Sequence, residues 1–289
     1  MRPLFFIYVF VLLALVGCEN KAAVKRPQQR TVYDHQVITA LCTSAVHDDK
    51  VFQGFRGNPF FHLLFEDISF DLGQHYLDLI KKEDPDLLDL MGSFSENDLF
   101  GSPKTFDFGL SQPISPPTLR YVKNLGDFRR VFGNLNGLRI IEIGGGYGGQ
   151  CKIFSSIFNF ASYTIVDLRE NLALAKKYLE KQGIHNVEYL TVEELQSEAA
   201  YDLVISNCGF SEFHRQYQKQ LFDKVLTKSR RGFLICDVFP KHFGVTPYSR
   251  EELMEKFKKE KVVCQLTQQE PSFSKEQYVI FWNYNSQER

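Results

Sequence analysis

The segment whose residue types best suit ligand binding is Gly144-Gly145-Gly146-Tyr147-Gly148-Gly149, which follows the apolar run 139–143. Glycine is needed where the backbone approaches a ligand closely or adopts a positive φ angle. Asp167 lies 23 residues after Gly144 and ends a second apolar run, 163–166. A carboxylate at that place can accept hydrogen bonds from both hydroxyls of a ribose. The loop and the carboxylate together predict a site for a cofactor that contains adenosine.

The glycine spacing alone fits two kinds of adenosine cofactor, because Gly144, Gly146 and Gly149 also match the G-x-G-x-x-G pattern of dinucleotide-binding domains. Four features favour S-adenosylmethionine over NAD or FAD: the acidic Glu142 before the glycines, the roughly 140 residues after the loop, the apolar run 202–205 that leads into small polar residues, and a terminal antiparallel strand. An NAD-binding oxidoreductase remains an open alternative, as does a domain that has lost its ligand.

Candidate acid–base residues follow the fourth and fifth predicted strands. In methyl transfer from a sulfonium to an alcohol, the protein must align the reactants and remove the alcohol proton. Ligands bind at the carboxyl ends of parallel strands, so we expect the proton acceptor among Glu212, His214, Asp237 and His242. Simpler roles compete: an exposed side chain for either histidine, a turn cap for Asp237, and a first-turn helix carboxylate for Glu212. We predict Glu212, His214 and Asp237 as the catalytic residues.

Neither a metal ion nor a nucleic acid is expected as a partner. Glu212 and Asp237 have the oxygen chemistry that suits Mg²⁺, but no close-spaced cluster of His or Asp supports a metal site. The formal net charge is −1, from 34 basic and 35 acidic residues, and no long basic run is present. A nucleic-acid-binding surface would show a basic patch or stripe.

Alternating strands and helices after residue 137 must position these side chains. Helices are expected between most of the strands, one of them opened by a capping box of Ser249 and Glu252. This alternation predicts a parallel sheet with helices on both faces, and the absence of a helix before the last strand predicts that it runs antiparallel. The expected fold class is therefore α/β: a Rossmann-like, mostly parallel seven-stranded sheet with a final antiparallel strand, preceded by a helical N-terminal region. The predicted strands are 139–143, 163–166, 187–190, 201–206, 233–236, 262–266 and 278–282.

The N-terminal end differs in character from the rest. Arg2 is followed by an apolar run that ends in Leu15-Val16-Gly17-Cys18, a pattern of charge and length typical of a secretory signal. The last four residues resemble the bacterial lipoprotein box, which predicts lipidation at Cys18 and attachment to a membrane. We divide the chain into a signal or lipobox-like segment at 1–18, a tether at 19–32, a helical region with its connecting loop at 33–117, and the α/β domain at 118–289.

The side of the membrane is left open by the sequence. Lys21, Lys25, Arg26 and Arg30 follow the apolar run, and positive charge prefers the cytoplasmic side. Without Cys18, five cysteines remain, and this odd number indicates reduced core thiols rather than a disulfide framework.

Four motifs are shared with a known family: SPPTLRY at 115–121, EIGGGYGGQ at 142–150, YTIVDL at 163–168 and SNCGFSE at 206–212. In them the chain resembles the bacterial sugar O-methyltransferases, a family of class I S-adenosylmethionine-dependent methyltransferases, over roughly residues 95–285. The resemblance implies the class I methyltransferase fold, S-adenosyl-L-methionine as cofactor, and a hydroxyl of a sugar, glycan or glycolipid as acceptor.

The resemblance also implies roles for individual residues. Ser211 and Glu212 would face the reacting centre with Asn207, and Arg120 and Tyr121 would belong to a lid over the site. By the resemblance, Gly144, Gly146, Tyr147 and Asp167 would bind the cofactor. The full set of predicted cofactor-contacting residues adds Glu142, Gly145, Leu168 and Asn207.

The lipoprotein-like N-terminus departs from the family. Because S-adenosylmethionine is made and kept in the cytosol, cofactor supply favours the cytosolic face of the membrane. The alternative is a non-catalytic, membrane-attached lipoprotein that retains the fold.

Overall fold

The computed structural model describes residues 36–62, 67–196, 200–237, 246–272 and 276–283. The predicted signal segment at 1–18, with Cys18, and the tether at 19–32 lie outside the described residues, and so does His242. Among the described residues, no helix has both the length and the apolar composition that crossing a bilayer requires.

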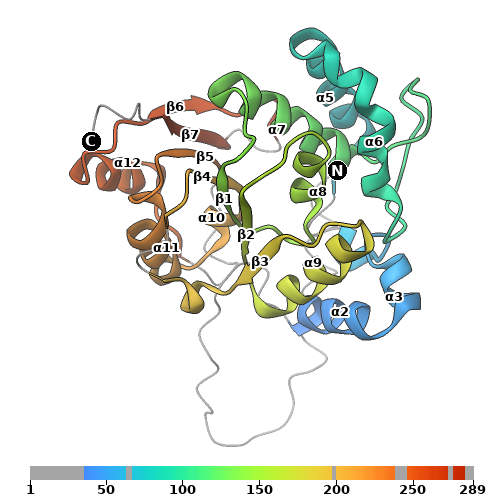
Figure 1. Ribbon diagram of the computed structural model, residues 1–289, viewed down its shortest axis with the longest axis horizontal. Helices are drawn as coiled ribbons and strands as arrows, with labels where there is room; N and C mark the ends of the chain where they lie inside the picture. The colour runs from blue at the N-terminus through green and yellow to red at the C-terminus, as the bar shows by residue number, and fades with distance from the viewer. Residues whose placement is uncertain (1–35, 63–66, 197–199, 238–245, 273–275, 284–289) are drawn as a thin grey trace, which may run out of the picture.

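In the described part of the chain, seven strands form one sheet in the order β3-β2-β1-β4-β5-β7-β6 (Figure 1). The first five strands are mutually parallel, and β7 runs antiparallel to both of its neighbours. The predicted fold class, with its antiparallel last strand, is confirmed. The strands are β1 (Arg139–Ile143), β2 (Ser162–Val166), β3 (Val187–Leu190), β4 (Leu203–Asn207), β5 (Arg231–Cys236), β6 (Gln265–Gln268) and β7 (Tyr278–Asn283).

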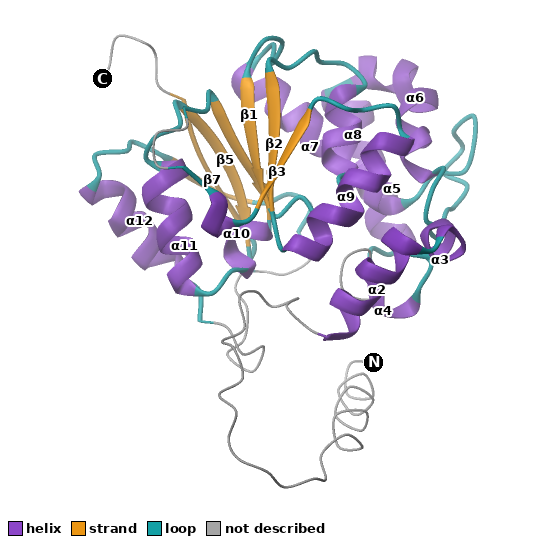
Figure 2. Cartoon of the chain, turned by 60° about the horizontal axis from the view of Figure 1, so that its bottom comes forward, coloured by secondary structure: helices purple, strands orange, loops and turns teal. Residues whose placement is uncertain are grey.

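Helices cover both faces of the sheet, which gives three layers (Figure 2). One face packs on α7 (Pro116–Phe132), α8 (Gly149–Ser155) and α9 (Arg169–Lys181). The other face packs on α10 (Gly209–Glu212), α11 (Arg215–Leu221) with the π-helical turn η5 (Phe222–Leu226), and α12 (Arg250–Lys259). The predicted capping box opens α12, where Ser249 and Glu252 bond each other's backbone.

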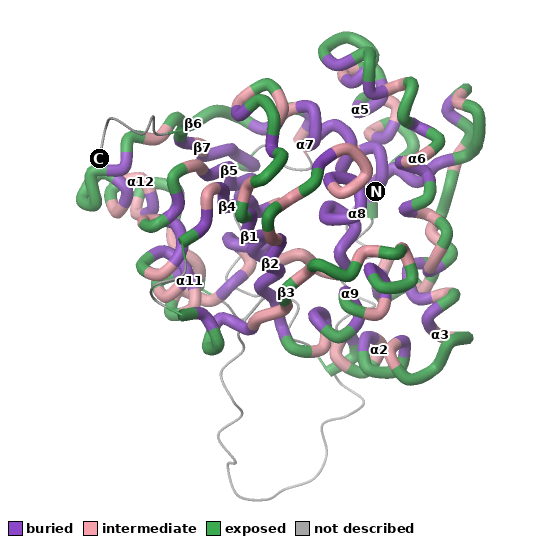
Figure 3. Tube along the Cα trace, in the orientation of Figure 1, coloured by how far each residue is buried: buried purple, intermediate pink, exposed green. Residues whose placement is uncertain are grey.

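Successive side chains along a strand point to opposite faces of the sheet, and this alternation produces two hydrophobic clusters, one on each face. In β1, Ile140 belongs to the hydrophobic cluster on the α7–α9 side, and Ile141 and Ile143 belong to the cluster on the α10–α12 side. Because both faces of the central strands are buried, these strands are apolar throughout, as a parallel sheet with helices on both faces requires. Figure 3 shows the buried trace running along the strands and the inner sides of the helices.

The N-terminal helices extend the α7–α9 layer rather than forming a core of their own. Figure 1 places α2 beside α9 and α5 beside α7, and both pairs are in contact. A single hydrophobic cluster includes Ile38, Leu119 and Val279. The predicted boundary between residues 117 and 118 falls in the first turn of α7. The elements before α7 are α2 (Gln36–His47), α3 (Asp49–Gly54), α4 (Pro59–Phe61), α5 (Phe70–Glu83), η2 (Pro85–Leu90), α6 (Met91–Ser95) and η3 (Glu96–Asp98).

Two predicted segments differ from the structure by more than two residues. The sixth strand begins at Gln265 rather than at residue 262, because its position is set by pairing with β7, and all four of its residues are exposed. Gly, Ser, Pro and Asn recur at short intervals over residues 92–117, which predicts that the connecting loop lies there. In the structure this stretch begins with helical turns, since Phe94 is fully buried and draws α6 onto the core.

Candidate cofactor and active site

The loop after β1 has the backbone conformation that its glycines allow. Gly144, Gly146 and Gly148 have φ angles of 77°, 55° and 94°, in the left-handed region that favours glycine. Gly148 is the N-cap of α8, so the loop leads directly into a helix N-terminus. A Cβ atom added at Gly146 would meet no other heavy atom within 4 Å, so this part of the loop borders open space.

Asp167 faces this loop from the end of β2. One carboxylate oxygen accepts a hydrogen bond from the Gly146 amide at 2.8 Å, and the other accepts from the Leu168 amide at 2.7 Å and from Asn171 Nδ2 at 2.9 Å. The predicted pairing of bare backbone with a carboxylate is therefore present. The side chain is held at the place from which it can reach a ligand beside Gly146.

Glu142 lies beneath the loop. Its carboxylate accepts a hydrogen bond from Tyr163 Oη at 2.8 Å, and one of its oxygens would be 3.3 Å from a Cβ atom added at Gly145. Burial raises the pKa of Glu142 to about 7; the bond from Tyr163 lowers it and the nearby charge of Asp167 adds to the rise. Glu142 thus supports the loop from within the sheet.

The side chain of Tyr147 leaves the loop on the side of the N-terminal helices. Its ring is buried among aromatic rings of that region, and its hydroxyl accepts a hydrogen bond from Asn97 Nδ2 at 3.2 Å. The sequence predicted that Tyr147 contacts the cofactor, but it did not indicate that the side chain points away from the loop surface. In the structure, the backbone is the part of Tyr147 that belongs to the loop surface.

The loops after β1 and β4 meet at the centre of the sheet. Ser206 Oγ donates to the Ile143 carbonyl at 2.9 Å and accepts from the Phe210 amide at 2.8 Å. A Cβ atom added at Gly144 would come within 2.4 Å of Gly209 Cα, so this approach needs glycine. The strand order changes direction between β1 and β4, and such a switch point is where open α/β sheets bind ligands. Asn207, the last residue of β4, lies here, and Leu168 is the N-cap of α9 after β2.

Two of the three predicted catalytic residues come together at the carboxyl ends of β4 and β5. Burial and then the carboxylate of Glu212 raise the pKa of the Cys208 thiol, and Asp237 raises it further. Ser211 links the two loops, since its hydroxyl donates to the Cys208 carbonyl at 2.7 Å and accepts from the Asp237 amide at 3.0 Å. Glu212 and Asp237 therefore both lie near Cys208, where the loops after β4 and β5 meet.

His214 is positioned differently. It is the N-cap of α11, and its Nδ1 accepts a hydrogen bond from the Gln216 amide at 3.4 Å. This contact gives His214 a local role as a helix cap, whereas the simpler role expected from the sequence was an exposed side chain; the residue is half-buried. His242, the other histidine considered, lies outside the described residues.

Cys208 and Tyr76, which lie on the side of Glu212 and Asp237, were not among the site residues predicted from the sequence. Cys208 has a φ angle of 69°, uncommon for a residue with a side chain and often found at functional sites. Arg120 of α7 lies near the phenol of Tyr76 in α5 and near the thiol of Cys208. Burial raises the pKa of both groups, and the charge of Arg120 opposes that rise. The SPPTLRY motif pointed to Arg120, but Tyr76 looked like an ordinary core residue of an amphipathic helix.

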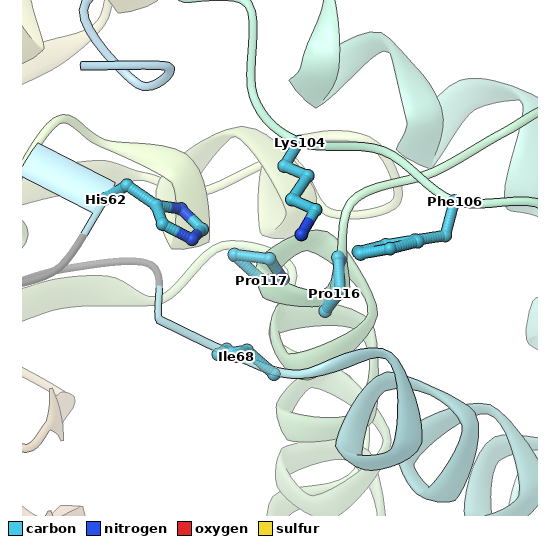
Figure 4. A pocket seen from close by; sticks show the side chains of 6 residues that line it. All are labelled: His62, Ile68, Lys104, Phe106, Pro116 and Pro117. Carbon is cyan, nitrogen blue, oxygen red and sulfur yellow. The ribbon is translucent and has the colours of Figure 1, made fainter. Parts of the chain in front are cut away.

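A shallow surface depression, with no enclosed space large enough for a water molecule, lies at the start of α7. Figure 4 shows the ammonium end of Lys104 and the imidazole of His62 turned toward it, with Phe106 and the rings of Pro116 and Pro117 forming its apolar sides.

Among the described residues, no group of three or more His, Cys, Asp or Glu side chains could hold a metal ion. The described cysteines, Cys42, Cys151, Cys208, Cys236 and Cys264, are free thiols.

The strand order, with five parallel strands followed by an antiparallel pair, defines this chain as an α/β protein with a Rossmann-like fold. No family model matches the chain. It is 31% identical over 115 residues to malonyl-[acyl-carrier protein] O-methyltransferase of Bacillus anthracis, covering 38% of this chain and 40% of that protein. It is 32% identical over 104 residues to ubiquinone biosynthesis O-methyltransferase of Rickettsia felis, covering 35% of this chain and 41% of that protein. The matches thus span about two fifths of the length of these relatives.

Two solved structures that are similar to part of this chain were determined with S-adenosylhomocysteine (SAH), bound in the first and present in the second. Magnesium protoporphyrin IX methyltransferase from Synechocystis PCC 6803 has a TM-score of 0.44 and 15% identity, covering 56% of this chain and 80% of that one. The N-terminal domain of EvdMO1, solved with SAH and D-fucose, has a TM-score of 0.43 and 18% identity, with the same coverage of 56% and 80%.

Proposed function

We propose that this chain is an S-adenosylmethionine-dependent O-methyltransferase. The observation that carries the proposal is the open space at Gly146 beside the Asp167 carboxylate, which already bonds the Gly146 amide. A ribose placed there would find a carboxylate for its hydroxyls and bare backbone against which to lie. The names of the two curated relatives, both O-methyltransferases, agree with this proposal.

Each group at the sheet edge has a defined task in this reaction. S-adenosylmethionine supplies a methyl group activated by its sulfonium. Asp167 and the loop hold the adenosyl part, with Leu168 and Asn207 at the neighbouring strand ends. Glu212 or Asp237 takes the proton of the acceptor hydroxyl as the new carbon–oxygen bond forms and the carbon–sulfur bond breaks. SAH and the methyl ether are the products.

We propose a sugar, glycan or glycolipid hydroxyl as the acceptor. The four motifs at 115–121, 142–150, 163–168 and 206–212 support this class of acceptor through their resemblance to the sugar O-methyltransferases.

We propose that the N-terminal segment attaches the protein to a membrane through lipidation at Cys18. The support is the apolar run that ends in Leu15-Val16-Gly17-Cys18. Cys18→Ala should release the protein from the membrane fraction and abolish incorporation of labelled fatty acid. Unchanged labelling and fractionation would contradict the proposal.

Calorimetric titration of the purified protein with SAH tests the cofactor directly. We expect a dissociation constant in the micromolar range and no heat of binding with NADH. If the folded protein does not bind SAH, the proposed reaction is excluded. Binding of NADH alone would favour an oxidoreductase.

Substitutions of Glu212 and Asp237 test the removal of the acceptor proton separately from cofactor binding. With labelled S-adenosylmethionine and a saccharide acceptor, Glu212→Gln or Asp237→Asn should lower kcat by about 10²–10⁴-fold, the usual contribution of a general base. Binding of SAH should stay unchanged. His214→Gln is the matched control and should keep most of the activity, because the His214 ring contacts the start of α11.

A further inference from the structure

The glycine loop has a single side chain through which the rest of the protein can hold it. Of residues 144–149, five are glycine and the sixth is Tyr147. Glycine loses more conformational freedom on folding than any other residue, so a loop of this composition keeps one shape only if something fixes it. Tyr147 lies between Gly146 and Gly148, which both have positive φ angles. Fixing Tyr147 therefore fixes the part of the loop that borders the open space.

The ring of Tyr147 is held on several sides by residues outside the loop. It packs edge-on against Phe55 and Tyr178, with ring centroids 5.7 Å and 5.0 Å away. The guanidinium of Arg56 lies over the ring face, 4.8 Å from its centroid. Rings packed edge-on and a cation over a ring face both attract through the charge distribution of the ring. These contacts fix the position of Tyr147, and the hydroxyl fixes its direction.

The hydroxyl of Tyr147 is held by Asn97, whose own amide is fixed at both ends. Asn97 Nδ2 donates to Tyr147 Oη at 3.2 Å and to Thr118 Oγ1 at 2.7 Å. Asn97 Oδ1 accepts from Tyr178 Oη at 2.8 Å. Asn97 is fully buried, so its amide has little freedom to turn.

A buried ion pair holds Asn97 in turn. Arg56, which is fully buried, donates to the Asn97 carbonyl at 2.8 Å and to Asp98 Oδ1 at 3.0 Å. Asp98 also accepts from the Ser115 amide at 2.6 Å and from Thr118 Oγ1 at 2.7 Å, at the start of α7. Buried ion pairs contribute little net stability compared with apolar packing, because both charges lose their hydration. A role in geometry explains this pair better than a role in stability.

We propose that Arg56, Asn97 and Asp98 are positioning residues of the cofactor site, which act through Tyr147 to hold the glycine loop in its binding shape before the ligand arrives. The proposal rests on the proposed function, since it assigns the loop to S-adenosylmethionine. It makes the N-terminal helices part of the cofactor site without any contact with the cofactor. Preorganisation of this kind raises affinity by reducing the entropy lost on binding.

The test is calorimetric titration with SAH of the full chain, at a temperature where circular dichroism shows every variant folded. Tyr147→Phe removes only the hydroxyl and keeps the ring packing, and we expect the dissociation constant to rise about 5-fold, as for one lost hydrogen bond. The matched control is Tyr201→Phe, which removes another buried phenol just before β4, at the amino ends of the strands and away from the glycine loop. We expect it to lower the melting temperature while leaving the affinity for SAH unchanged.

A second comparison links the effect to Asn97. If Asn97 acts through the Tyr147 hydroxyl, the double variant Asn97→Ala/Tyr147→Phe binds SAH no more weakly than Asn97→Ala alone. Wild-type affinity in Tyr147→Phe would overturn the proposal, as would equal weakening in Tyr201→Phe, which would indicate a general loss of stability. A wild-type protein that does not bind SAH would instead refute the proposed function on which the proposal rests.

Discussion

Gly146 and Asp167 show how two residues far apart in sequence make one site. Gly146 offers an amide, a positive φ angle and open space where a side chain would be, and Asp167 brings a carboxylate to that amide at 2.8 Å. Both properties could be predicted, because glycine spacing and an acidic residue after the next strand are visible in the sequence. The direction of the Tyr147 side chain could not, since it depends on contacts with Phe55 and Asn97, which lie far away in the chain.

Gly146→Asp should abolish binding of SAH, with an affinity loss of at least about 100-fold, since the new side chain enters the open space and places a charge beside Asp167. The protein should remain folded, because aspartate tolerates a positive φ angle better than most residues. Gly183→Asp is the matched control: Gly183 also has a positive φ angle and open surroundings, but it follows α9. Titration calorimetry of both variants measures the difference, and equal affinities would place the ligand elsewhere.

The buried Glu142 predicts a pH dependence of stability. Its pKa in the folded protein is about 7, above its ordinary value of 4.5, so the folded state binds more protons than the unfolded state between these values. The free energy of unfolding should therefore fall as pH rises from about 4.5 to about 7, by roughly 3 kcal/mol from this group alone. In Glu142→Gln this fall should be absent. Urea denaturation of both proteins at several pH values measures it, and identical pH profiles would contradict the assignment.

At the level of elements, the site depends on how closely the ends of β1 and β4 approach. Gly144 and Gly209 are in backbone contact, and Ser206 bonds the Ile143 carbonyl across the same gap. The sequence predicted the central strands because both of their faces are buried, which makes them continuously apolar. It misplaced β6, because an exposed edge strand with the sequence Gln265-Leu-Thr-Gln268 has almost no apolar pattern of its own.

Gly209→Ala should separate the two strand ends. A Cβ atom at this position would lie 2.5 Å from both Gly144 Cα and the Ile143 carbonyl oxygen, and backbone atoms cannot move aside cheaply. We expect a loss of about 1–3 kcal/mol of stability, typical of overpacking, with weaker binding of SAH. Gly92→Ala in α6 is the control, because an added Cβ atom there meets nothing within 4 Å. Thermal denaturation distinguishes the two, and an equally stable Gly209→Ala protein would contradict the close approach.

At the level of the whole molecule, the helices before α7 belong to the same folding unit as the sheet. One hydrophobic cluster joins Ile38 of α2, Leu119 of α7 and Val279 of β7. The sequence indicated helices here, but it could not show that they pack on α7 and α9 or that Tyr76 reaches the side of the site near Cys208. Such contacts between distant segments leave no periodic pattern in either segment.

Removal of the N-terminal helices should therefore prevent folding. A protein comprising residues 118–289 would expose the buried surfaces of α7 and α9 to water, and we expect it to be insoluble or unfolded. A protein that begins at residue 33 should unfold in one cooperative transition whose calorimetric and van't Hoff enthalpies agree. A folded 118–289 segment that binds SAH would show that the N-terminal helices are an independent addition.

The central claim is that bare backbone at 144–149 and the carboxylate of Asp167 together hold an adenosyl cofactor. The most direct measurement is a crystal structure of the protein grown with saturating SAH. We predict that the ribose hydroxyls lie within hydrogen-bonding distance of the Asp167 carboxylate and that the ligand fills the space beside Gly146. A ligand bound at another place, or an Asp167 carboxylate turned away from the ribose, would contradict the claim.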